Sequence, residues 1–164
     1  MIARPNKLKA IRDGFDRASI VSITGLRQSG KTTIAKEFAS KFSGKSTHFD
    51  LEDPRSLARL TEPMTALEGL SGLVVIDEVQ RLPSLFPILR VLADRIDQPA
   101  KLLLLGSASP VLIKEISESL AGRVALFEMD GFNLQEIGAE NIKNLWSRGG
   151  LPPSYLGKSD TDSF

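Results

Sequence analysis

The sequence predicts an α/β fold with a mostly parallel sheet. Short apolar or β-branched segments alternate along the chain with segments whose apolar residues recur at helical spacing. Two of the apolar segments, residues 73–76 and 101–105, are continuous, which is typical of strands buried on both faces. Strands that alternate with helices are joined by crossovers and therefore run parallel. The 164 residues are the length of one ordinary domain and can bury a hydrophobic core.

The expected elements can be placed along the chain by their composition and spacing. Strand segments are short and rich in β-branched or aliphatic residues, and helical segments repeat apolar residues every three or four positions. Gly44 is expected to end one helix, and Asp53 with Pro54 to open another, as cap and first-turn residue. In chain order we expect a helix over residues 7–15, a strand over 19–24, a helix over 33–42, a strand over 47–51, a helix from 54, a strand over 73–76, a helix over 85–95, a strand over 101–105, a helix over 111–120 and a strand over 124–127.

The composition excludes several classes of function. The chain has no Cys, so it has no disulfide framework and no Cys-based metal site, and His48 is its only His, which excludes a multi-His zinc site. No apolar run approaches the length of a membrane span, and the start of the chain lacks the apolar middle of a signal peptide. These features favour a cytoplasmic location and no membrane partner.

The charge balance gives no global attraction to nucleic acid, because 21 Lys and Arg face 20 Asp and Glu, a net charge of +1. The N-terminal stretch is locally basic. It is interpreted as a solvated helix face, with contact to DNA or another partner as the alternative. The residues concerned are Arg4, Lys7, Lys9, Arg12 and Arg17.

The segment from Gly25 to Thr32 follows a strand and opens a helix with the spacing G-x-x-x-x-G-K-T. Glycines at these positions allow backbone N–H groups to point inward and cradle phosphates, and the helix N-terminus adds its positive dipole end. Lys31 is expected to contact the β- and γ-phosphates, and the Thr32 hydroxyl to bind Mg²⁺. The predicted nucleotide-binding residues are Gly25, Arg27, Gln28, Ser29, Gly30, Lys31, Thr32 and Thr33.

Asp77 and Glu78 close the apolar strand over residues 73–76. Asp77 is expected to hold Mg²⁺ together with Thr32, and Glu78 to act as general base on the attacking water. The alternative is that the pair caps the next helix. Because ligands of parallel sheets sit beyond the carboxyl ends of the strands, we expect the phosphate loop, this acidic pair and Ser107 to meet at one edge.

Two further residues complete the predicted catalytic set. Ser107 follows the strand over residues 101–105 and is expected to sense the γ-phosphate, with Ser109 as the substitute and a turn or cap as the alternative. Arg123 is expected to stabilise charge on the γ-phosphate, from the same chain or from a neighbouring subunit, with a surface role as the alternative. The catalytic residues are thus Lys31, Glu78, Ser107 and Arg123.

Other polar residues near these motifs have weaker assignments. Arg27 and Gln28 contact phosphate, a partner or only solvent, and Gln80 and Arg81 are candidates for relaying nucleotide state to a partner. His48 is expected to pack at a strand edge. Capping and turn roles are favoured over contact with Mg²⁺-bound water for the remaining acidic residues Asp50, Glu52 and Asp53.

Five segments, in this order, resemble the prokaryotic AAA+-type ATPases with an AAA_14 domain. They are GLRQSGKTT, LVVIDEVQRLP, LLLLGSAS, SLAGRV and RGGLPPSYL. The resemblance covers about residues 4–156. It implies a P-loop NTPase three-layer sandwich, with a five-stranded sheet of order 5-1-4-3-2 and helices on both faces. It also implies Walker A positions at Lys31 and Thr32, Walker B positions at Asp77 and Glu78, the first sensor at Ser107 and an arginine finger at Arg123.

Members of that family usually continue into a C-terminal DUF4143 region. The resemblance therefore implies that residues 1–18 are an N-terminal helix and lead-in, residues 19–138 the ATPase core, and residues 139–164 the truncated start of a C-terminal region. The segment from Trp146 to Pro153 is expected to be a turn, and residues 159–163 a polar tail.

Together these features predict an Mg²⁺-dependent ATPase that converts ATP to ADP and phosphate and couples nucleotide state to a partner or to the missing C-terminal domain. The alternative is a nucleotide-binding switch or scaffold with little turnover, for which association with DNA is considered, and a phosphotransferase acting on a small acceptor is less favoured. Expected partners are ATP or ADP and the C-terminal domain, with a second copy of the chain and DNA as further candidates.

Overall fold

A computed structural model describes residues 2–96 and 100–157 of the chain. Its centre is a five-stranded sheet in the order β2-β3-β4-β1-β5, and every neighbouring pair runs parallel. This confirms both the predicted α/β class and the strand order that the resemblance implies. The strands are β1 (Ile20–Gly25), β2 (Ser46–Asp50), β3 (Gly72–Asp77), β4 (Ala100–Ser107) and β5 (Val124–Met129).

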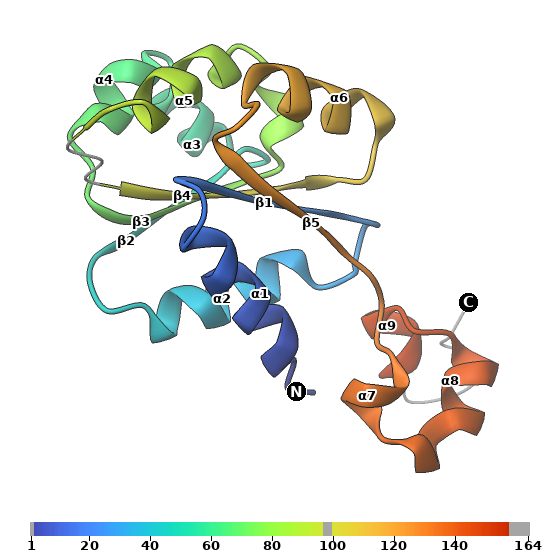
Figure 1. Cartoon of the computed structure of the whole chain (residues 1–164). Coiled ribbons are helices and arrows are strands. Elements are labelled where there is room, and N and C mark those ends of the chain that lie inside the picture. The colour runs from blue at the N-terminus through green and yellow to red at the C-terminus, as the bar shows by residue number, and fades with distance from the viewer. Residues whose placement is uncertain (1, 97–99, 158–164) are drawn as a thin grey trace.

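Helices cover both faces of the sheet (Figure 1), as expected for a three-layer sandwich. One face carries α1 (Pro5–Phe15) and α2 (Lys31–Lys41). The other face carries α3 (Pro54–Arg59), α4 (Pro63–Glu68), α5 (Leu85–Ala93) and α6 (Pro110–Ser119). A third group lies beyond the end of β5 and consists of α7 (Leu134–Ile137), α8 (Ile142–Arg148) and α9 (Pro152–Tyr155). The short 3₁₀ helices are η1 (Val79–Arg81) and η2 (Ala139–Asn141).

The core has two parts, one on each side of the sheet. Successive side chains of a strand point to opposite faces, so Val74 and Ile76 pack under α3–α6 while Leu73 and Val75 pack against α1 and α2. Because both faces of β3 and β4 are buried, these strands appear in the sequence as continuous apolar runs. The buried Ile11 belongs to the same cluster as Leu73, so α1 is part of the core.

The C-terminal part differs from the predicted turn over residues 146–153. Trp146 and Arg148 lie in α8, and only the short stretch before α9 is a turn. The physical reason is that no Gly or Pro interrupts residues 142–148, and Gly149, with φ 74°, then ends the helix by donating its N–H to the Leu145 carbonyl at 2.9 Å. The predicted polar tail over residues 159–163 lies outside the described residues.

In the described residues, 2–96 and 100–157, every helix is too short or too polar to cross a membrane.

Candidate functional site

The carboxyl ends of β1, β3 and β4 form the edge at which the predicted motifs meet. Gly25 at the end of β1 is paired in register with Ser107 at the end of β4. Asp77 ends β3, the strand on the other side of β4. The phosphate-binding motif, the acidic pair and Ser107 therefore lie at one edge, as the sequence predicts.

The loop between β1 and α2 has a backbone that only certain residues allow. A side chain at Gly25 would place its Cβ atom 2.4 Å from the Met129 carbonyl oxygen, so that position requires glycine. Gln28 and Gly30 adopt left-handed backbone angles, with φ 63° and 93°. Since Gly30 gives no side-chain cap to α2, the first N–H groups of that helix remain directed toward a ligand at the loop.

Lys31, the first residue of α2, lies under this loop. Its Nζ donates to the carbonyl oxygens of Gly25 at 3.1 Å and Leu26 at 2.9 Å, and the residue is 6% exposed. Burial lowers the pKa of the ammonium below its ordinary value, while the Glu78 and Asp77 carboxylates raise it and Arg27 lowers it. The present hydrogen-bond partners of the Lys31 ammonium are thus two neutral carbonyls. A hydrogen bond from the ammonium to an anionic ligand is stronger, which favours replacement of these carbonyls by such a ligand.

Thr32 and Asp77 are joined across the site. The Thr32 hydroxyl donates to Asp77 Oδ2 at 2.7 Å, and Asp77 Oδ1 accepts the Glu78 N–H at 3.0 Å. Asp77 is only 4% exposed, so its carboxylate is held in one orientation. A hydroxyl and a carboxylate are hard oxygen donors of the kind that Mg²⁺ takes.

The oxygen donors at this edge, Thr32 and Asp77, fit a metal ion whose other coordination positions are filled by water and by oxygens of a bound ligand. No group of three or more His, Cys, Asp or Glu residues within residues 2–96 and 100–157 could hold a metal by itself. Mg²⁺ usually binds through one or two carboxylates together with substrate phosphates, so the Thr32–Asp77 pair matches Mg²⁺ carried by a phosphate ligand.

Glu78 has a strained backbone and a bound side chain. It is a non-glycine residue in the left-handed region, with φ 56° and ψ 44°, a conformation that costs on the order of 1–3 kcal/mol and is concentrated at functional sites. Its Oε2 accepts a hydrogen bond from Gln80 Nε2 at 2.5 Å. The Gln80 Oε1 atom is buried, has no hydrogen-bond partner among the described residues and lies next to Gly106, where an added Cβ would be 2.9 Å away. Gln80 therefore links Glu78 to the end of β4.

The two serines after β4 have different surroundings. Ser107 is the last residue of β4 and lies beside Gly25 of the phosphate loop, where its predicted sensing role places it. Ser109, the predicted substitute, caps α6 by accepting the Leu112 N–H at 3.2 Å. Ser107 therefore remains the better candidate.

Arg123 does not lie with the other site residues. It immediately precedes β5, whose first residue, Val124, is in register with Ile20 at the start of β1. The length of β1 then separates it from the phosphate loop, about 20 Å for six residues of strand. Its guanidinium binds Asp94 instead, at 2.5 and 2.9 Å. A contribution of Arg123 to the phosphates of its own chain does not fit this geometry, and a contribution to a neighbouring copy stays a prediction.

The weaker candidates have local roles. Arg27 and Arg81 both approach the Glu52 carboxylate, at 3.6 and 3.5 Å, on the exposed rim of the site. Asp53 caps α3 by accepting the Arg55 N–H at 3.0 Å, and Asp50 accepts the Glu52 N–H at 2.9 Å. These contacts agree with the favoured capping and turn roles. His48 lies in β2, the edge strand.

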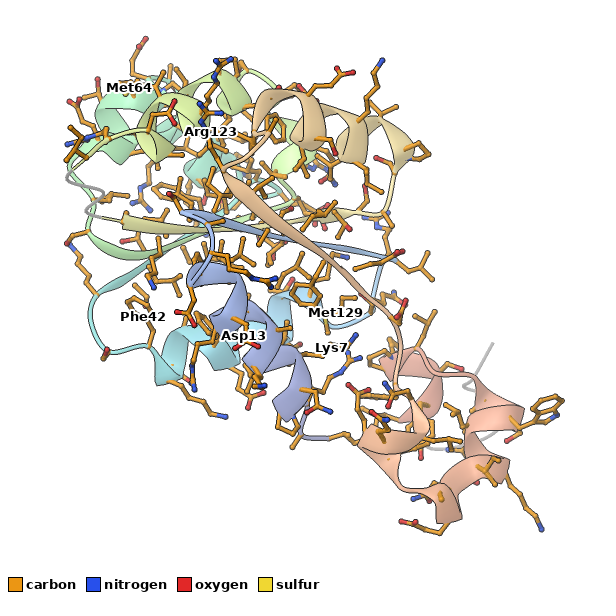
Figure 2. All side chains as sticks on the ribbon, viewed as in Figure 1. Lys7, Asp13, Phe42, Met64, Arg123 and Met129 are labelled. Atoms are coloured by element: carbon orange, nitrogen blue, oxygen red, sulfur yellow. The ribbon has the colours of Figure 1, made fainter. Side chains whose placement is uncertain are left out.

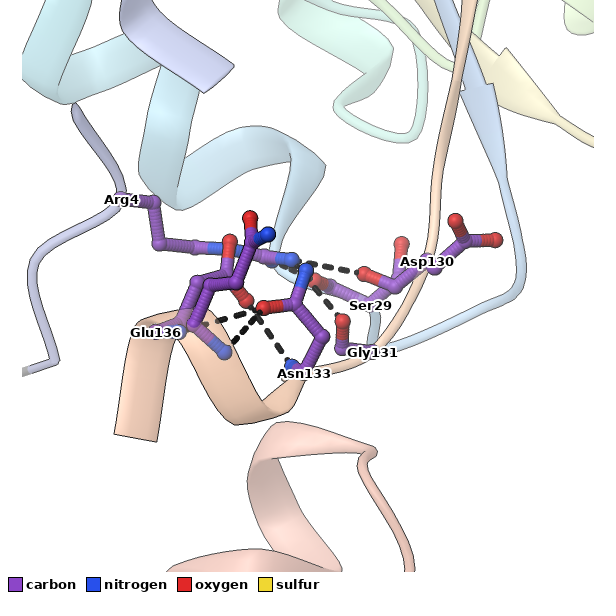
Figure 3. A network of polar contacts seen from close by, with 7 residues as sticks. Arg4, Ser29, Asp130, Gly131, Asn133 and Glu136 are labelled. Carbon is purple, nitrogen blue, oxygen red and sulfur yellow. Dashed lines mark hydrogen bonds and ion pairs between the residues drawn. The ribbon is translucent and has the colours of Figure 1, made fainter. Parts of the chain in front are cut away.

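Sequence reasoning missed Arg4, which connects the phosphate loop to the C-terminal helices (Figure 3). Its Nε donates to Glu136 Oε1 at 2.7 Å, and its terminal nitrogens donate to the backbone carbonyls of Ser29, Asp130 and Gly131 at 3.1, 2.9 and 3.0 Å. Both side chains of the ion pair are 6% exposed.

Glu136 is oriented for Arg4 by a second set of contacts. It occupies the third position of α7, and its Oε2 accepts the Asn133 N–H at 3.2 Å while Asn133 Oδ1 accepts the Glu136 N–H at 3.1 Å. The sequence signal for this capping box was Asn133 followed three residues later by Glu136. The suggestion that Arg4 belongs to a solvent-facing basic surface is wrong, because Arg4 is buried.

We expect Arg4→Met to lower the free energy of unfolding by about 3 kcal/mol. Met keeps the apolar stem, but the buried Glu136 carboxylate and three carbonyls lose their donor. Urea denaturation followed by circular dichroism measures the change. Lys9→Met is the matched control, because the Lys9–Asp13 pair is exposed and 3.8 Å apart, and we expect a change below about 0.5 kcal/mol. Equal losses in the two variants would contradict a structural role for the Arg4 network.

Comparison with known proteins places the chain in a family. The family model described as an AAA domain, AAA_14, matches residues 17–138. The chain is 49% identical over 166 residues to uncharacterized protein Mb2031c of Mycobacterium bovis and to uncharacterized protein Rv2008c of Mycobacterium tuberculosis. In both cases the match covers 99% of this chain and 36% of the relative, so the chain spans about a third of the length of these relatives.

Solved structures share the fold at low sequence identity. The Walker-type ATPase PABY2304 of Pyrococcus abyssi matches with a TM-score of 0.70 and 13% identity, over 99% of this chain and 70% of that one. The ORC1 protein of Aeropyrum pernix, solved in complex with DNA, matches with a TM-score of 0.57 and 14% identity, over 87% of this chain and 49% of that one. At these identities the likeness shows the fold alone.

Proposed function

Because the chain belongs to the AAA-domain family whose model matches residues 17–138, we propose that it binds ATP with Mg²⁺ and hydrolyses it to ADP and phosphate. The observation that carries this proposal is the pairing of Thr32 with Asp77 beside a phosphate loop that already encloses Lys31. A structural turn needs neither a buried cation nor a carboxylate held against a hydroxyl at the helix start.

Phosphate binding is assigned to the loop backbone and Lys31. The left-handed angles at Gln28 and Gly30 turn successive N–H groups toward the same side, which forms an anion-binding concavity. Lys31 Nζ would exchange the Gly25 and Leu26 carbonyls for phosphate oxygens, and its pKa would rise when the anion binds.

Thr32 and Asp77 would hold the metal. With the nucleotide bound, Mg²⁺ held by these two residues would supply positive charge that offsets the charge developing on the phosphates. To accept the metal, the Thr32 hydroxyl would direct a free lone pair to the ion, because in its present bond it is the donor to Asp77 Oδ2. The bond between Asp77 Oδ1 and the Glu78 N–H keeps the carboxylate in place during this change.

Water activation is assigned to Glu78 and sensing to Ser107. A carboxylate at the edge of a phosphate site can accept a proton from the attacking water. The Ser107 hydroxyl, beside Gly25, would contact the γ-phosphate or the water. Positioning and charge stabilisation would supply most of the rate gain.

An apolar cavity of about 130 Å³ next to the phosphate loop is assigned to the nucleotide base. Gly30 and Thr33 line it from the loop and α2, and Phe132 and Pro152 line it from the C-terminal segment. Arg4, which also lines it, binds the Ser29 carbonyl and Glu136. The residues that would contact the base thus come from both the core and the C-terminal helices, which supports the proposal that nucleotide state is coupled to the region that follows them.

We expect Asp77→Asn to remove the dependence of ATP binding on Mg²⁺. The amide keeps the shape of the side chain but lacks the negative charge that the metal needs, so affinity should be nearly equal with MgCl₂ and with EDTA. Isothermal titration calorimetry of wild type and variant under both conditions measures this. Asp50→Asn, at the end of the neighbouring strand β2, is the matched control and should keep the wild-type dependence. A variant that still required Mg²⁺ would exclude Asp77 as a metal ligand.

One observation favours a second function, a nucleotide-controlled switch with little turnover. Glu78 is restrained by Gln80 and by its left-handed backbone, so its carboxylate is engaged within the protein. A base that remains engaged after ATP binds would leave a stable ATP-bound state. The output would then be a changed contact with a partner, such as the C-terminal region or DNA.

A further inference from the structure

A second candidate binding surface lies at the opposite edge of the sheet from the phosphate loop. A cleft of about 330 Å³ is formed where α1 and α2 end and β4 begins. All three of the described charged residues that line it are cations, namely Arg12, Lys41 and Lys101. Its apolar lining includes Phe15, Phe38 and Phe42.

This cleft adjoins a larger one of about 450 Å³, since Phe15 and Lys101 line both. The larger cleft adds the cations Arg17 and Arg123 and the carboxylates Asp16 and Asp94, of which Asp94 already binds Arg123. We name the two joined clefts the amino-edge groove. Figure 2 shows two of its residues, Phe42 and Arg123, on the side of the molecule away from α7–α9.

The charge in the amino-edge groove is not a general property of the chain. The whole sequence has a net charge of +1, whereas the described residues that line the groove include five cations and two carboxylates. Four of these cations are exposed, namely Arg12, Arg17, Lys41 and Lys101. A groove with this excess of positive charge attracts a polyanion. Because the groove extends along two clefts, a linear polyanion fits it best.

Aromatic rings give the groove a second property. Phe15 and Phe38 stack with their centroids 5.9 Å apart, and Phe38 lies 6.3 Å from Phe42. Phe42 is half-buried, so part of its ring faces the groove. Lys101 Nζ lies 5.4 Å from the Phe15 ring centroid, which keeps a cation beside the aromatic lining. Cations that follow a phosphate backbone next to rings on which bases stack are the features of a single-strand binding site.

We propose that the amino-edge groove binds single-stranded nucleic acid. A single strand fits better than a duplex, because only unpaired bases can turn from the backbone and stack on Phe42. The groove is separate from the phosphate loop, so the proposal does not rest on ATP binding. It also replaces the basic surface considered from the sequence, since Arg4 is buried, Lys7 lies 6.0 Å from the Phe127 ring, and only Arg12 and Arg17 of that set line the groove.

Fluorescence anisotropy of a labelled oligothymidylate of about 20 nucleotides tests the proposal on the whole chain. We expect Arg12→Glu and Lys101→Glu each to weaken binding about ten-fold or more at low salt. Each should also reduce the slope of log affinity against log salt by about 0.7, the contribution of one phosphate contact. Lys114→Glu is the matched control, because it makes the same charge change on α6, on the other face of the sheet, and it should bind like wild type.

Phe42→Leu separates stacking from charge. Removing a ring on which a base stacks should weaken binding about five-fold or more, whereas the salt slope should not change because no charge is lost. Circular dichroism of each variant confirms that it is folded. Wild-type affinity in both Arg12→Glu and Lys101→Glu would overturn the proposal.

Competitors and a P-loop variant complete the test. Equal competition by unlabelled duplex or by poly-glutamate would also overturn it, and would assign the groove to polyanions in general or to an acidic protein. Lys31→Ala should bind the oligonucleotide like wild type. Loss of binding in that variant would place the nucleic acid at the phosphate loop, so this proposal and the proposed ATPase function fail in distinguishable ways.

Discussion

Lys31→Ala is expected to weaken binding of Mg²⁺-ATP by at least about 100-fold. Lys31 is a buried cation under the phosphate loop, with Nζ on the Gly25 and Leu26 carbonyls. Its loss removes charge-assisted hydrogen bonds to phosphate, each worth about 1.5–3 kcal/mol, and two such bonds correspond to at least 100-fold in affinity. Isothermal titration calorimetry with ATP and a non-hydrolysable analogue, with and without Mg²⁺, measures the change.

The control for this variant is Lys36→Ala. Lys36 is an exposed residue of the same helix, so its removal changes the net charge equally but leaves the loop intact. It should bind Mg²⁺-ATP within about two-fold of wild type. If the well-folded wild type bound no nucleotide, the phosphate loop would be a structural relic or would need a segment outside these 164 residues. If Lys31→Ala bound like wild type, the nucleotide would lie elsewhere.

The phosphate loop could be predicted because its chemistry is local. Eight consecutive residues, from Gly25 to Thr32, contain the spacing, the cation and the hydroxyl. Asp77 and Ser107 required one more step, the rule that carboxyl ends of parallel strands meet at one edge, and the register of Gly25 with Ser107 agrees with it. The residues that this rule brings together are those found together in the structure.

The same rule argues against Arg123 within one chain. A residue that immediately precedes a parallel strand lies at the amino edge, so the position of Arg123 before Val124 already separates it from Gly25. The resemblance alone favoured an arginine finger there. An arginine finger at the amino edge can reach only the phosphates of a neighbouring copy of the chain. Arg123 therefore remains a predicted arginine finger only between two copies.

The role of Arg4 could not be predicted because it depends on contacts between distant parts of the chain. Arg4 and Glu136 are 132 positions apart, and three of the partners of Arg4 are backbone carbonyls, which leave no pattern in the sequence. Because Arg4 lies near the N-terminus among other cations, the sequence alone predicts that it is a surface residue. Only the path of β5 past α2 brings Asp130 and Gly131 next to Ser29 and gives Arg4 a buried site.

The Arg4 network also gives the C-terminal segment a physical connection to the phosphate loop. Ser29 lies in the phosphate loop, and Glu136 lies in α7. A shift of the loop when phosphate binds would move the Ser29 carbonyl that Arg4 binds. Breaking the buried ion pair between Arg4 and Glu136 costs a large free energy, so we expect the two side chains to stay paired. The match covers 36% of the relative's length, and we propose that this connection is the route by which nucleotide state reaches the rest of the protein.

Glu78→Gln is expected to lower ATP turnover by about 10²–10⁴-fold and to leave ATP affinity within a few-fold of wild type. The amide keeps the size of the side chain but cannot accept a proton from water, and general-base catalysis contributes a factor of this order. Phosphate release under saturating Mg²⁺-ATP measures turnover, and calorimetry measures binding. Glu52→Gln is the matched control, because Glu52 is a rim carboxylate that contacts Arg27 and Arg81 and should not affect turnover.

The result also decides between the two proposed functions. A hydrolase loses turnover in Glu78→Gln and keeps binding, which assigns the base to Glu78. A switch whose Glu78 stays bound to Gln80 has a wild-type rate close to that of the variant, so the two proteins differ little. Measurable turnover that Glu78→Gln leaves unchanged would contradict the role of Glu78 in both readings, and would require another group at the carboxyl edge to activate the water.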